Sequence, residues 1–233
     1  MCTQCGCSDT LTKISPSVKI LIEQDIQAAH NNQVFNDNHI FSLNIMGSPG
    51  SGKTSLLEKT IVLLGDRLRI GVIEGDLETS NDAERIRAKG VPAYQITTGS
   101  ACHLDAFMVS HAMTHIPIDN LDLVFIENVG NLVCPAVYSL GTHCNVVVLS
   151  VTEGDDKPAK YPVIFRAAQI LVITKTDLLP YVDFSIDKAA LEVVKINPAI
   201  KVIELSVKNG IGMDSWINLL NNGVKGMSPL AGV

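Results

Sequence analysis

The segment from Gly47 to Thr54 combines glycines, a lysine and a hydroxyl in the pattern G-x-x-x-x-G-K-T. An apolar run over residues 40–46 precedes it and a helical apolar pattern follows it, which is the strand–loop–helix context of a phosphate-binding P-loop. There the backbone N–H groups face a phosphate, Lys53 reaches its outer oxygens, and the Thr54 hydroxyl binds Mg²⁺. The nucleotide-binding residues expected in this segment are Gly47, Ser48, Pro49, Gly50, Ser51, Gly52, Lys53, Thr54 and Ser55.

Acidic residues follow two of the predicted strands and are candidates for the same site. Strand 69–74 is followed by Asp76, and strand 121–126 by Glu127, at the carboxyl edge of the sheet where ligands bind. Asp76 is expected in the Mg²⁺ shell, with a capping role before a helix over 84–89 as the alternative; Asp82 fits a cap or a switch. Glu127 would hold Mg²⁺ or orient water, and Gly130 would donate its N–H to a γ-phosphate. The predicted catalytic residues are Lys53, Glu127 and Gly130.

Two loops later in the chain have the composition of a guanine site. Strand 170–173 leads into Thr174-Lys175-Thr176-Asp177, similar to Asn-Lys-x-Asp, and strand 201–205 leads into Ser206-Val207-Lys208, similar to Ser-Ala-Lys. An aspartate at position 177 accepts hydrogen bonds from guanine N1–H and the 2-amino group, which adenine does not offer. GTP is therefore predicted over ATP, and Thr174 in the Asn position is expected to loosen the hold on the base. The base-side candidates are Lys175, Asp177, Ser206, Val207 and Lys208.

Six cysteines in a chain without a signal-peptide pattern favour metal or redox chemistry over structural disulfides. Cys2, Cys5 and Cys7 lie close enough to share one soft metal ion, and a redox pair or thiols without a role are the alternatives. A linker over 8–14 separates them from the rest of the chain, so this tail is expected to act independently.

A second group of thiols lies near the nucleotide motifs. Cys102 and His103 are expected to open a helix, whose dipole would lower the pKa of the Cys102 thiol, and a buried thiol beside a surface histidine is the alternative. The expected apolar face of that helix is Leu104, Phe107, Met108 and His111. Cys134 follows Gly130 by four residues and ends the switch segment, residues 127–134. His111 and His115 are interpreted as ordinary helix residues, and Cys144 as a small buried hydrophobe.

Composition limits the classes of function. The chain of 233 residues is 46% hydrophobic with a net charge of −6, which supplies a core and argues against nucleic-acid or anionic-membrane surfaces. No apolar run reaches membrane-spanning length, and a cytoplasmic location is expected.

The alternation of strands and helices predicts an α/β P-loop NTPase fold of three layers, with a mostly parallel sheet and helices on both faces. The expected organisation is a Cys-rich tail and linker over 1–14, a GTPase domain over 15–222, and a flexible tail over 223–233. An N-terminal helix is expected from Pro16, ended by Asn31-Asn32 and by the cluster Asn36-Asp37-Asn38. Its apolar stripe is expected to dock on its own domain, with a partner subunit as the alternative, and contains Val18, Leu21, Ile22, Ile26 and Ala29.

The motifs together resemble the nickel-incorporation GTPases of hydrogenase maturation, the HypB family. The resemblance rests on Cys-x-x-Cys-Gly-Cys, the P-loop, Cys102-His103, the segment from Glu127 to Cys134, Glu-Gly-Asp-Asp-Lys-Pro and the guanine loops. It implies a SIMIBI-class fold, a GTP-dependent homodimer, and a nickel or zinc site of Cys102, His103 and Cys134 where two subunits meet. It also implies as partners a maturation protein and the large-subunit precursor of a [NiFe]-hydrogenase, to which nickel is delivered.

Two departures from the family pattern and two alternatives accompany this resemblance. Residues 8–40 contain only His30 and His39, so the His-rich nickel store of some members is not expected, and Thr174 replaces Asn. Urease-maturation GTPases join Cys, Pro and His in one motif, whereas here Ala136 follows Cys134-Pro135. A metal-buffering protein with vestigial nucleotide binding is disfavoured by the intact Lys53, Thr54 and Glu127.

Overall fold

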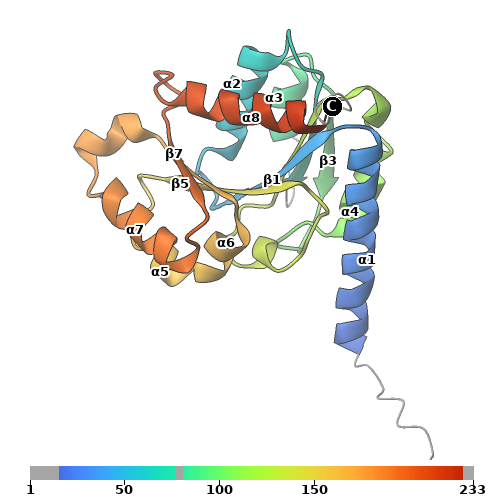
Figure 1. Cartoon of the computed structure of the whole chain (residues 1–233), viewed down its shortest axis with the longest axis horizontal. Coiled ribbons are helices and arrows are strands. Elements are labelled where there is room, and N and C mark those ends of the chain that lie inside the picture. Colours follow the sequence, from blue (N-terminus) through green and yellow to red (C-terminus); the bar gives the residue numbers. More distant parts are fainter. Residues whose placement is uncertain (1–15, 77–80, 228–233) are drawn as a thin grey trace, which may run out of the picture.

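The computed structural model describes residues 16–76 and 81–227, and in this part of the chain seven strands form one sheet (Figure 1). Their order is β3-β2-β4-β1-β5-β6-β7, and every pair of neighbouring strands is parallel, as expected for the α/β class. The strands are β1 Phe41–Gly47, β2 Ile70–Asp76, β3 Ala93–Thr97, β4 Leu123–Glu127, β5 Cys144–Ser150, β6 Ile170–Thr174 and β7 Lys201–Glu204.

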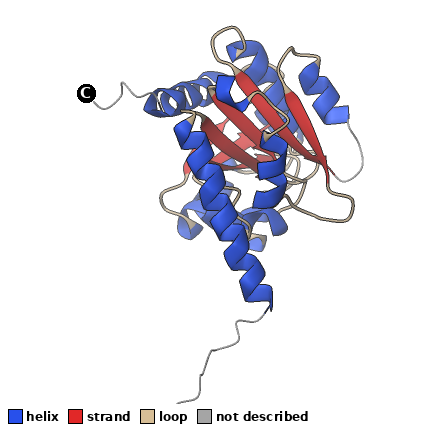
Figure 2. Ribbon diagram, turned by 90° about the vertical axis from the view of Figure 1, so that its right-hand side faces the viewer, coloured by secondary structure: helices blue, strands red, loops and turns tan. Residues whose placement is uncertain are grey.

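Helices cover both faces of the sheet, which gives the predicted three layers (Figure 2). Helices α2, α3 and α8 pack on one face, and α1, α4, α6 and α7 on the other. The helices are α1 Pro16–Asp37, α2 Lys53–Leu64, α3 Asn81–Arg87, α4 Ala106–Met113, α5 Lys157–Lys160, α6 Pro162–Ala167, α7 Ile186–Ile196 and α8 Met213–Met227.

The central strands are apolar on both faces because helices cover both. Along β5, Val146 and Val148 pack with α2 and α8, whereas the alternate residues Val147 and Leu149 pack with α6 and α7. This alternation follows from the two-residue period of a strand. The sheet is therefore fixed in register by the two cores, and its carboxyl edge becomes a rigid base for loops.

Helix α1 docks mainly through its second half. Asn31 and Phe35 are fully buried, and the Asn31 amide donates to the carbonyls of Ala106 (2.8 Å) and Leu140 (3.1 Å). The helix therefore continues past Asn31-Asn32 and stops at Asp37, within the second of the two clusters that were expected to end it. Its first half projects from the domain (Figures 1 and 2), with Ile26 65% exposed, so the expected docking of the whole stripe is wrong.

The C-terminal helix is longer than expected. Helix α8 continues to Met227, so the tail expected from residue 223 begins no earlier than residue 228. Gly223 packs so closely on Phe41 that an added Cβ would lie 2.2 Å from the ring. Trp216 is fully buried, and its indole N–H donates to Thr60 on α2 (2.9 Å). These contacts fix α8 against the helix that follows the P-loop.

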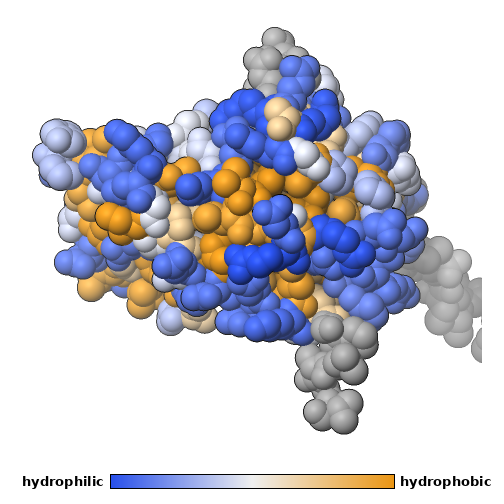
Figure 3. Space-filling view, turned by 90° about the horizontal axis from the view of Figure 1, so that it is seen from above, coloured by the Kyte–Doolittle hydropathy of each residue, from blue (hydrophilic) through white to orange (hydrophobic). Residues whose placement is uncertain are grey.

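Figure 3 shows the molecule from the side on which α2, α3 and α8 lie in Figure 1. Apolar surface there is interrupted by hydrophilic side chains, and Val62 and Leu63 of α2 are among the exposed apolar residues. None of the helices in the described ranges combines the length and apolar character needed to cross a bilayer.

Candidate functional site

The P-loop lies between the central strand β1 and helix α2, and it borders a cavity of about 480 Å³. Gly47 has φ +153°, and a Cβ there would lie 2.4 Å from the Val148 carbonyl oxygen, so the turn needs glycine. Lys53 and Thr54 start α2 and are buried, and the Lys53 ammonium donates to the Ser48 carbonyl (3.1 Å). The lining residues are Pro49, Gly50, Gly52, Lys53, Thr54, Ser55, Glu74, Gly75, Asp76, Asp82, Arg85, Glu127, Asn128, Val129, Gly130 and Lys175.

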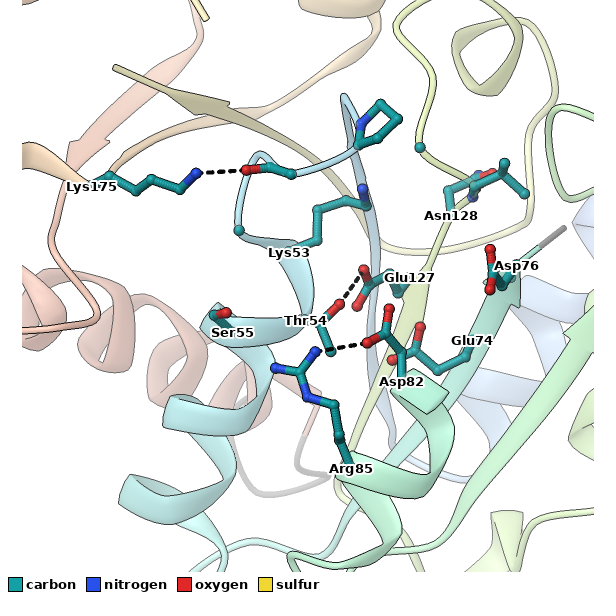
Figure 4. Close-up of a pocket in the computed structure, with 16 residues that line it drawn as sticks. Lys53, Thr54, Ser55, Glu74, Asp76, Asp82, Arg85, Glu127, Asn128 and Lys175 are labelled. Carbon is teal, nitrogen blue, oxygen red and sulfur yellow. Dashed lines mark hydrogen bonds and ion pairs between the residues drawn. The ribbon is translucent and has the colours of Figure 1, made fainter. Parts of the chain in front are cut away.

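The structure thus brings Asp76, Glu127 and Gly130 to the P-loop, as the order of strand ends predicted. Asp76 closes β2, and α3 begins only at Asn81, so Asp76 is not the cap of that helix. Asp82 lies in the first turn of α3 and pairs with Arg85 (2.7 Å) beside the cavity (Figure 4). Of the other predicted P-loop residues, Ser51 is fully buried and does not line the cavity.

A second buried carboxyl group, Glu74, was not anticipated. It lies opposite Glu127 in the register of β2 and β4 and is only 2% exposed. Burial raises the pKa of Glu127 to about 7, and burial together with the Glu127 charge raises the pKa of Glu74 well above its ordinary value. The two groups therefore share less than two negative charges when no cation is near.

This carboxyl pair fits a hard divalent cation. The Thr54 hydroxyl donates to Glu127 Oε1 (2.9 Å), whereas Glu127 Oε2 and Glu74 Oε1 are buried without a hydrogen-bond partner in the part of the chain described. Buried carboxylate oxygens without donors are costly unless a cation or water satisfies them. Oxygen ligands of this kind beside a phosphate-binding loop are those that Mg²⁺ prefers.

The switch segment after β4 contacts both the P-loop and the loop before α4. The Asn131 N–H donates to the Gly47 carbonyl (3.0 Å), and Gly130 lies against Pro49, where a Cβ would come within 2.8 Å of the proline ring. The fully buried Asn128 side chain accepts from the Leu104 N–H (3.0 Å). Residues next to the cavity are therefore bonded to the chain next to Cys102 and His103.

A second cavity of about 370 Å³ adjoins the first and shares Gly52, Ser55 and Lys175 with it. Asp177, Val207 and Lys208 line it, as the two base-side loops predicted. Ser206 is buried and donates to Asp177 Oδ1 (2.5 Å), so it holds the carboxylate instead of lining the cavity. The two cavities therefore form one groove, with the P-loop along the first part and the base-side loops along the second.

Thr174 and Lys175 tie the base side of this groove to the P-loop. The Thr174 hydroxyl donates to the Ser51 carbonyl (2.6 Å), and the Lys175 ammonium donates to the Gly50 carbonyl (2.7 Å; Figure 4). A hydroxyl has one proton to donate, so Thr174 has none left for a base. Lys175 adopts φ +59°, a left-handed conformation that non-glycine residues rarely hold outside functional loops.

Cys102, His103 and Cys134 meet beside the switch segment, and their ligand atoms all lie within 4.8 Å of one another. The His103 ring stacks on Tyr138, with centroids 4.1 Å apart and planes 7° apart. The hydrogen bond with Cys102 raises the pKa of the Cys134 thiol, and burial lowers the pKa of His103. Two thiols and an imidazole form a set suited to nickel or zinc with a position left open.

The helical position expected for Cys102 is wrong. Helix α4 begins at Ala106, because Asp105 caps it by accepting from the Met108 N–H (2.8 Å). Cys102 and His103 lie in the bends before that cap, so the helix dipole does not act on Cys102 as supposed. Phe107 and His111, expected on the apolar face, are exposed, and the buried residues of the helix are Ala106, Val109, Ala112 and Met113.

The remaining cysteines separate into two groups. Cys144 is buried in β5, as expected, and burial raises its pKa to about 12, so it is inert. Cys2, Cys5 and Cys7 lie outside the described residues, and the site expected there stays a prediction.

Known proteins are similar to this chain in sequence and in fold. A family model of the CobW/HypB/UreG nucleotide-binding domain matches residues 41–204. Hydrogenase maturation factor HypB of Azotobacter vinelandii is 52% identical over 212 residues, which cover 88% of this chain and 69% of that protein. The Escherichia coli K12 protein of the same name is 52% identical over 178 residues, covering 76% of this chain and 61% of its own length.

Solved structures give the same result. Helicobacter pylori HypB in complex with nickel has a TM-score of 0.84 and 39% identity, covering 88% of this chain and 96% of that one. Archaeoglobus fulgidus HypB has a TM-score of 0.83 and 41% identity, covering 88% and 100%. A LAO/AO transport system kinase (TM-score 0.54, 15% identity, covering 96% and 78%) shares the fold alone. The predicted three-layer α/β P-loop fold is confirmed.

Proposed function

Because this chain belongs to the HypB family of hydrogenase maturation factors, we propose that it is a GTPase that binds nickel and helps to insert it into a [NiFe]-hydrogenase precursor. The observation that carries the proposal is the contact between the two candidate sites: the switch segment that borders the phosphate cavity also supplies Cys134 and holds Leu104. Nucleotide state and metal state can therefore influence each other. The test is slow hydrolysis of GTP, with ATP as the comparison, by protein whose nickel content is known.

In this proposal each candidate residue has a role that its position supports. Lys53 and the P-loop N–H groups hold the β- and γ-phosphates, Glu127 positions the attacking water, and Gly130 donates its N–H to the γ-phosphate. Thr54, Asp76 and Glu127 would hold Mg²⁺, which when bound neutralises charge on the phosphates. Arg85 lines the cavity, but Glu58 and Asp82 engage its guanidinium, so a low intrinsic rate is expected.

Nickel is the cargo in this proposal, and Cys102, His103 and Cys134 are its ligands, with zinc as a second occupant. A homodimer formed with GTP would place two such sets together, and the N-terminal thiols would hold a further metal ion. The proposed partners are another maturation protein and the hydrogenase large-subunit precursor, and the proposed location is the cytoplasm. Ala136 at the position after Cys134-Pro135 favours this function over a urease-type GTPase.

Binding of Mg²⁺ with GDP is expected to release about one proton from Glu127 at about pH 6. The metal-free carboxyl group has a pKa of about 7 and is mostly protonated there, whereas a cation needs the carboxylate. Affinity should therefore rise with pH up to about 7 and then level off. Calorimetry in two buffers of different ionisation enthalpy measures the released proton, with Glu127→Gln as the control. Equal proton release by wild type and Glu127→Gln would contradict the assignment.

Asp177→Asn is expected to lower GTP affinity by about 10- to 150-fold, the cost of losing hydrogen bonds to a charged acceptor. The same change should favour xanthosine triphosphate, whose position 2 carries an oxygen that can accept a hydrogen bond from an amide N–H. Titration of both nucleotides against wild type and variant measures the exchange. Ser206→Ala is the graded comparison, because it leaves the carboxylate but removes the hydroxyl that holds it. Unchanged GTP affinity in Asp177→Asn would remove Asp177 from the base site.

A further inference from the structure

Two exposed histidines lie side by side at the C-terminal end of α4, away from the candidate sites described above. The ring centroids of His111 and His115 are 4.6 Å apart, and the two side chains face solvent. Tyr94 of β3 stacks on the His115 ring at 4.4 Å. His111 lies in the last turn of α4, which ends at Met113, and His115 lies in the turn that follows, so that turn brings the two imidazoles together.

The hydrogen bonds of His115 determine which of its nitrogens is free. Its Nδ1 lies 3.0 Å from the His111 carbonyl oxygen, which can only accept, so Nδ1 carries the proton. The Thr114 hydroxyl donates to that same carbonyl (2.7 Å) and lies 3.1 Å from Nδ1, where it accepts. The neutral ring therefore presents an unprotonated Nε2. A histidine whose other nitrogen donates to a backbone carbonyl is the arrangement found in metal-ligating histidines.

We propose that His111 and His115 form a second, surface metal site for a divalent transition-metal ion of nickel type. Imidazole nitrogens suit Ni²⁺, Cu²⁺ and Zn²⁺. Stacking on Tyr94 already restricts the His115 ring, so the ring loses less rotational freedom when a metal ion binds. Two protein ligands leave the other positions to water, so the ion exchanges readily. Cys102 and His103 precede α4, whereas the pair lies at the other end of that helix.

This site differs in kind from the Cys102, His103 and Cys134 cluster. It has no thiol, it lies at the C-terminal end of α4 instead of the switch segment, and the structure shows no bond joining it to the nucleotide cavity among the described residues. Its occupancy should therefore be independent of nucleotide, and it should accept nickel in protein whose Cys102 and Cys134 are replaced by serine.

The experiment is a Ni²⁺ titration of the full chain with GDP, in wild type and in the Cys102→Ser/Cys134→Ser form. The six histidines are followed by NMR of their ring signals, and Ni²⁺ equivalents by competition with a coloured indicator. Paramagnetic broadening is expected first at His111 and His115, before His30 and His39. The ¹⁵N shifts of His115 should show the proton on Nδ1.

His115→Ala should weaken this equivalent by at least about tenfold, since changes around metal ligands already cost 10- to 100-fold. His30→Ala, which removes an exposed histidine of α1, should not change it. Circular dichroism melting confirms that the variants fold. Broadening at the pair no stronger than at His30, or the same Ni²⁺ affinity in wild type and His115→Ala, would overturn the proposal. The proposed function does not depend on this outcome, because it rests on Cys102, His103 and Cys134.

Discussion

Lys53→Ala is expected to lower the rate of GTP hydrolysis by about 10²- to 10³-fold, the usual cost of removing one preorganised donor to a reacting phosphate or oxyanion. The Lys53 side chain is 7% exposed at the start of α2, and its ammonium group lies 3.1 Å from the Ser48 carbonyl and 3.4 Å from that of Gly47. Those carbonyls hold the positive charge in place above the cavity. A phosphate entering the P-loop meets that charge without waiting for a side chain to reorganise.

Lys59→Ala is the matched control, because Lys59 lies on the same helix and does not line the cavity. Phosphate release under saturating GTP measures the rates, and GDP binding shows whether the P-loop survives. Hydrolysis by Lys53→Ala at the wild-type rate would make the P-loop assignment wrong.

The sheet and the P-loop were predictable because local sequence determines them. Continuous apolar runs of strand length, each followed by glycine or an acidic residue, indicate buried parallel strands with functional carboxyl ends. The run before Gly47 became β1, and the runs ending near Asp76 and Glu127 became β2 and β4. The cavity residues gather as predicted because parallel strands bring their ends to one edge.

Residues whose role depends on a partner distant in sequence were not predictable in the same way. Glu74 reads as part of a strand, and only the pairing of β2 with β4 places it opposite Glu127. Alternation along β2 could have suggested it, since Glu74 and Asp76 share one face. Asn128 and Tyr138 had no signal, because their contacts with Leu104 and His103 depend on tertiary packing.

Two expectations, the start of α4 and the docking of α1, differ from the structure because a local pattern does not determine them alone. Cys102 was assigned to a helix start because an apolar pattern follows it, but Asp105 is the stronger cap and moved the start to Ala106. The periodicity of the α1 stripe predicts docking on its own domain, yet the first half of the helix projects from that domain, with Ile26 65% exposed. Periodicity predicts the helix but does not supply its partner.

Cys134→Ala is expected to weaken nickel binding at the candidate metal site and to abolish its dependence on nucleotide, while GDP still binds. Cys134 is one of three candidate ligands in the cluster, so its loss leaves Cys102 and His103, a pair too small to hold the ion tightly. The thiol follows a segment whose Gly130 lies against Pro49 and whose Asn131 pairs with Gly47. A γ-phosphate that moves Gly130 must move or restrain Cys134.

The measurement is the nickel affinity of the full chain with GDP and with a non-hydrolysable GTP analogue. Wild type should differ between the two states by at least about fivefold, the lower end of common coupling energies. Cys144→Ala is the control, because it removes a buried thiol that lies outside the cluster. Equal affinities of wild type in both states would remove the coupling.

Asn128→Ala separates ligation from coupling. This variant keeps all three candidate metal ligands but removes the acceptor of the Leu104 N–H, so the loop that carries Cys102 and His103 loses its buried hydrogen bond to the switch segment. It should therefore bind nickel with smaller dependence on nucleotide than wild type, whereas Cys134→Ala binds nickel weakly in both states. Because coupling between two sites is reciprocal, nickel must change the affinity for the GTP analogue by the factor by which the analogue changes nickel affinity. Measuring both effects in one preparation tests the link through Asn128 and Cys134. If the effect of nickel on nucleotide binding is as large in Asn128→Ala as in wild type, the coupling does not depend on the Asn128 hydrogen bond.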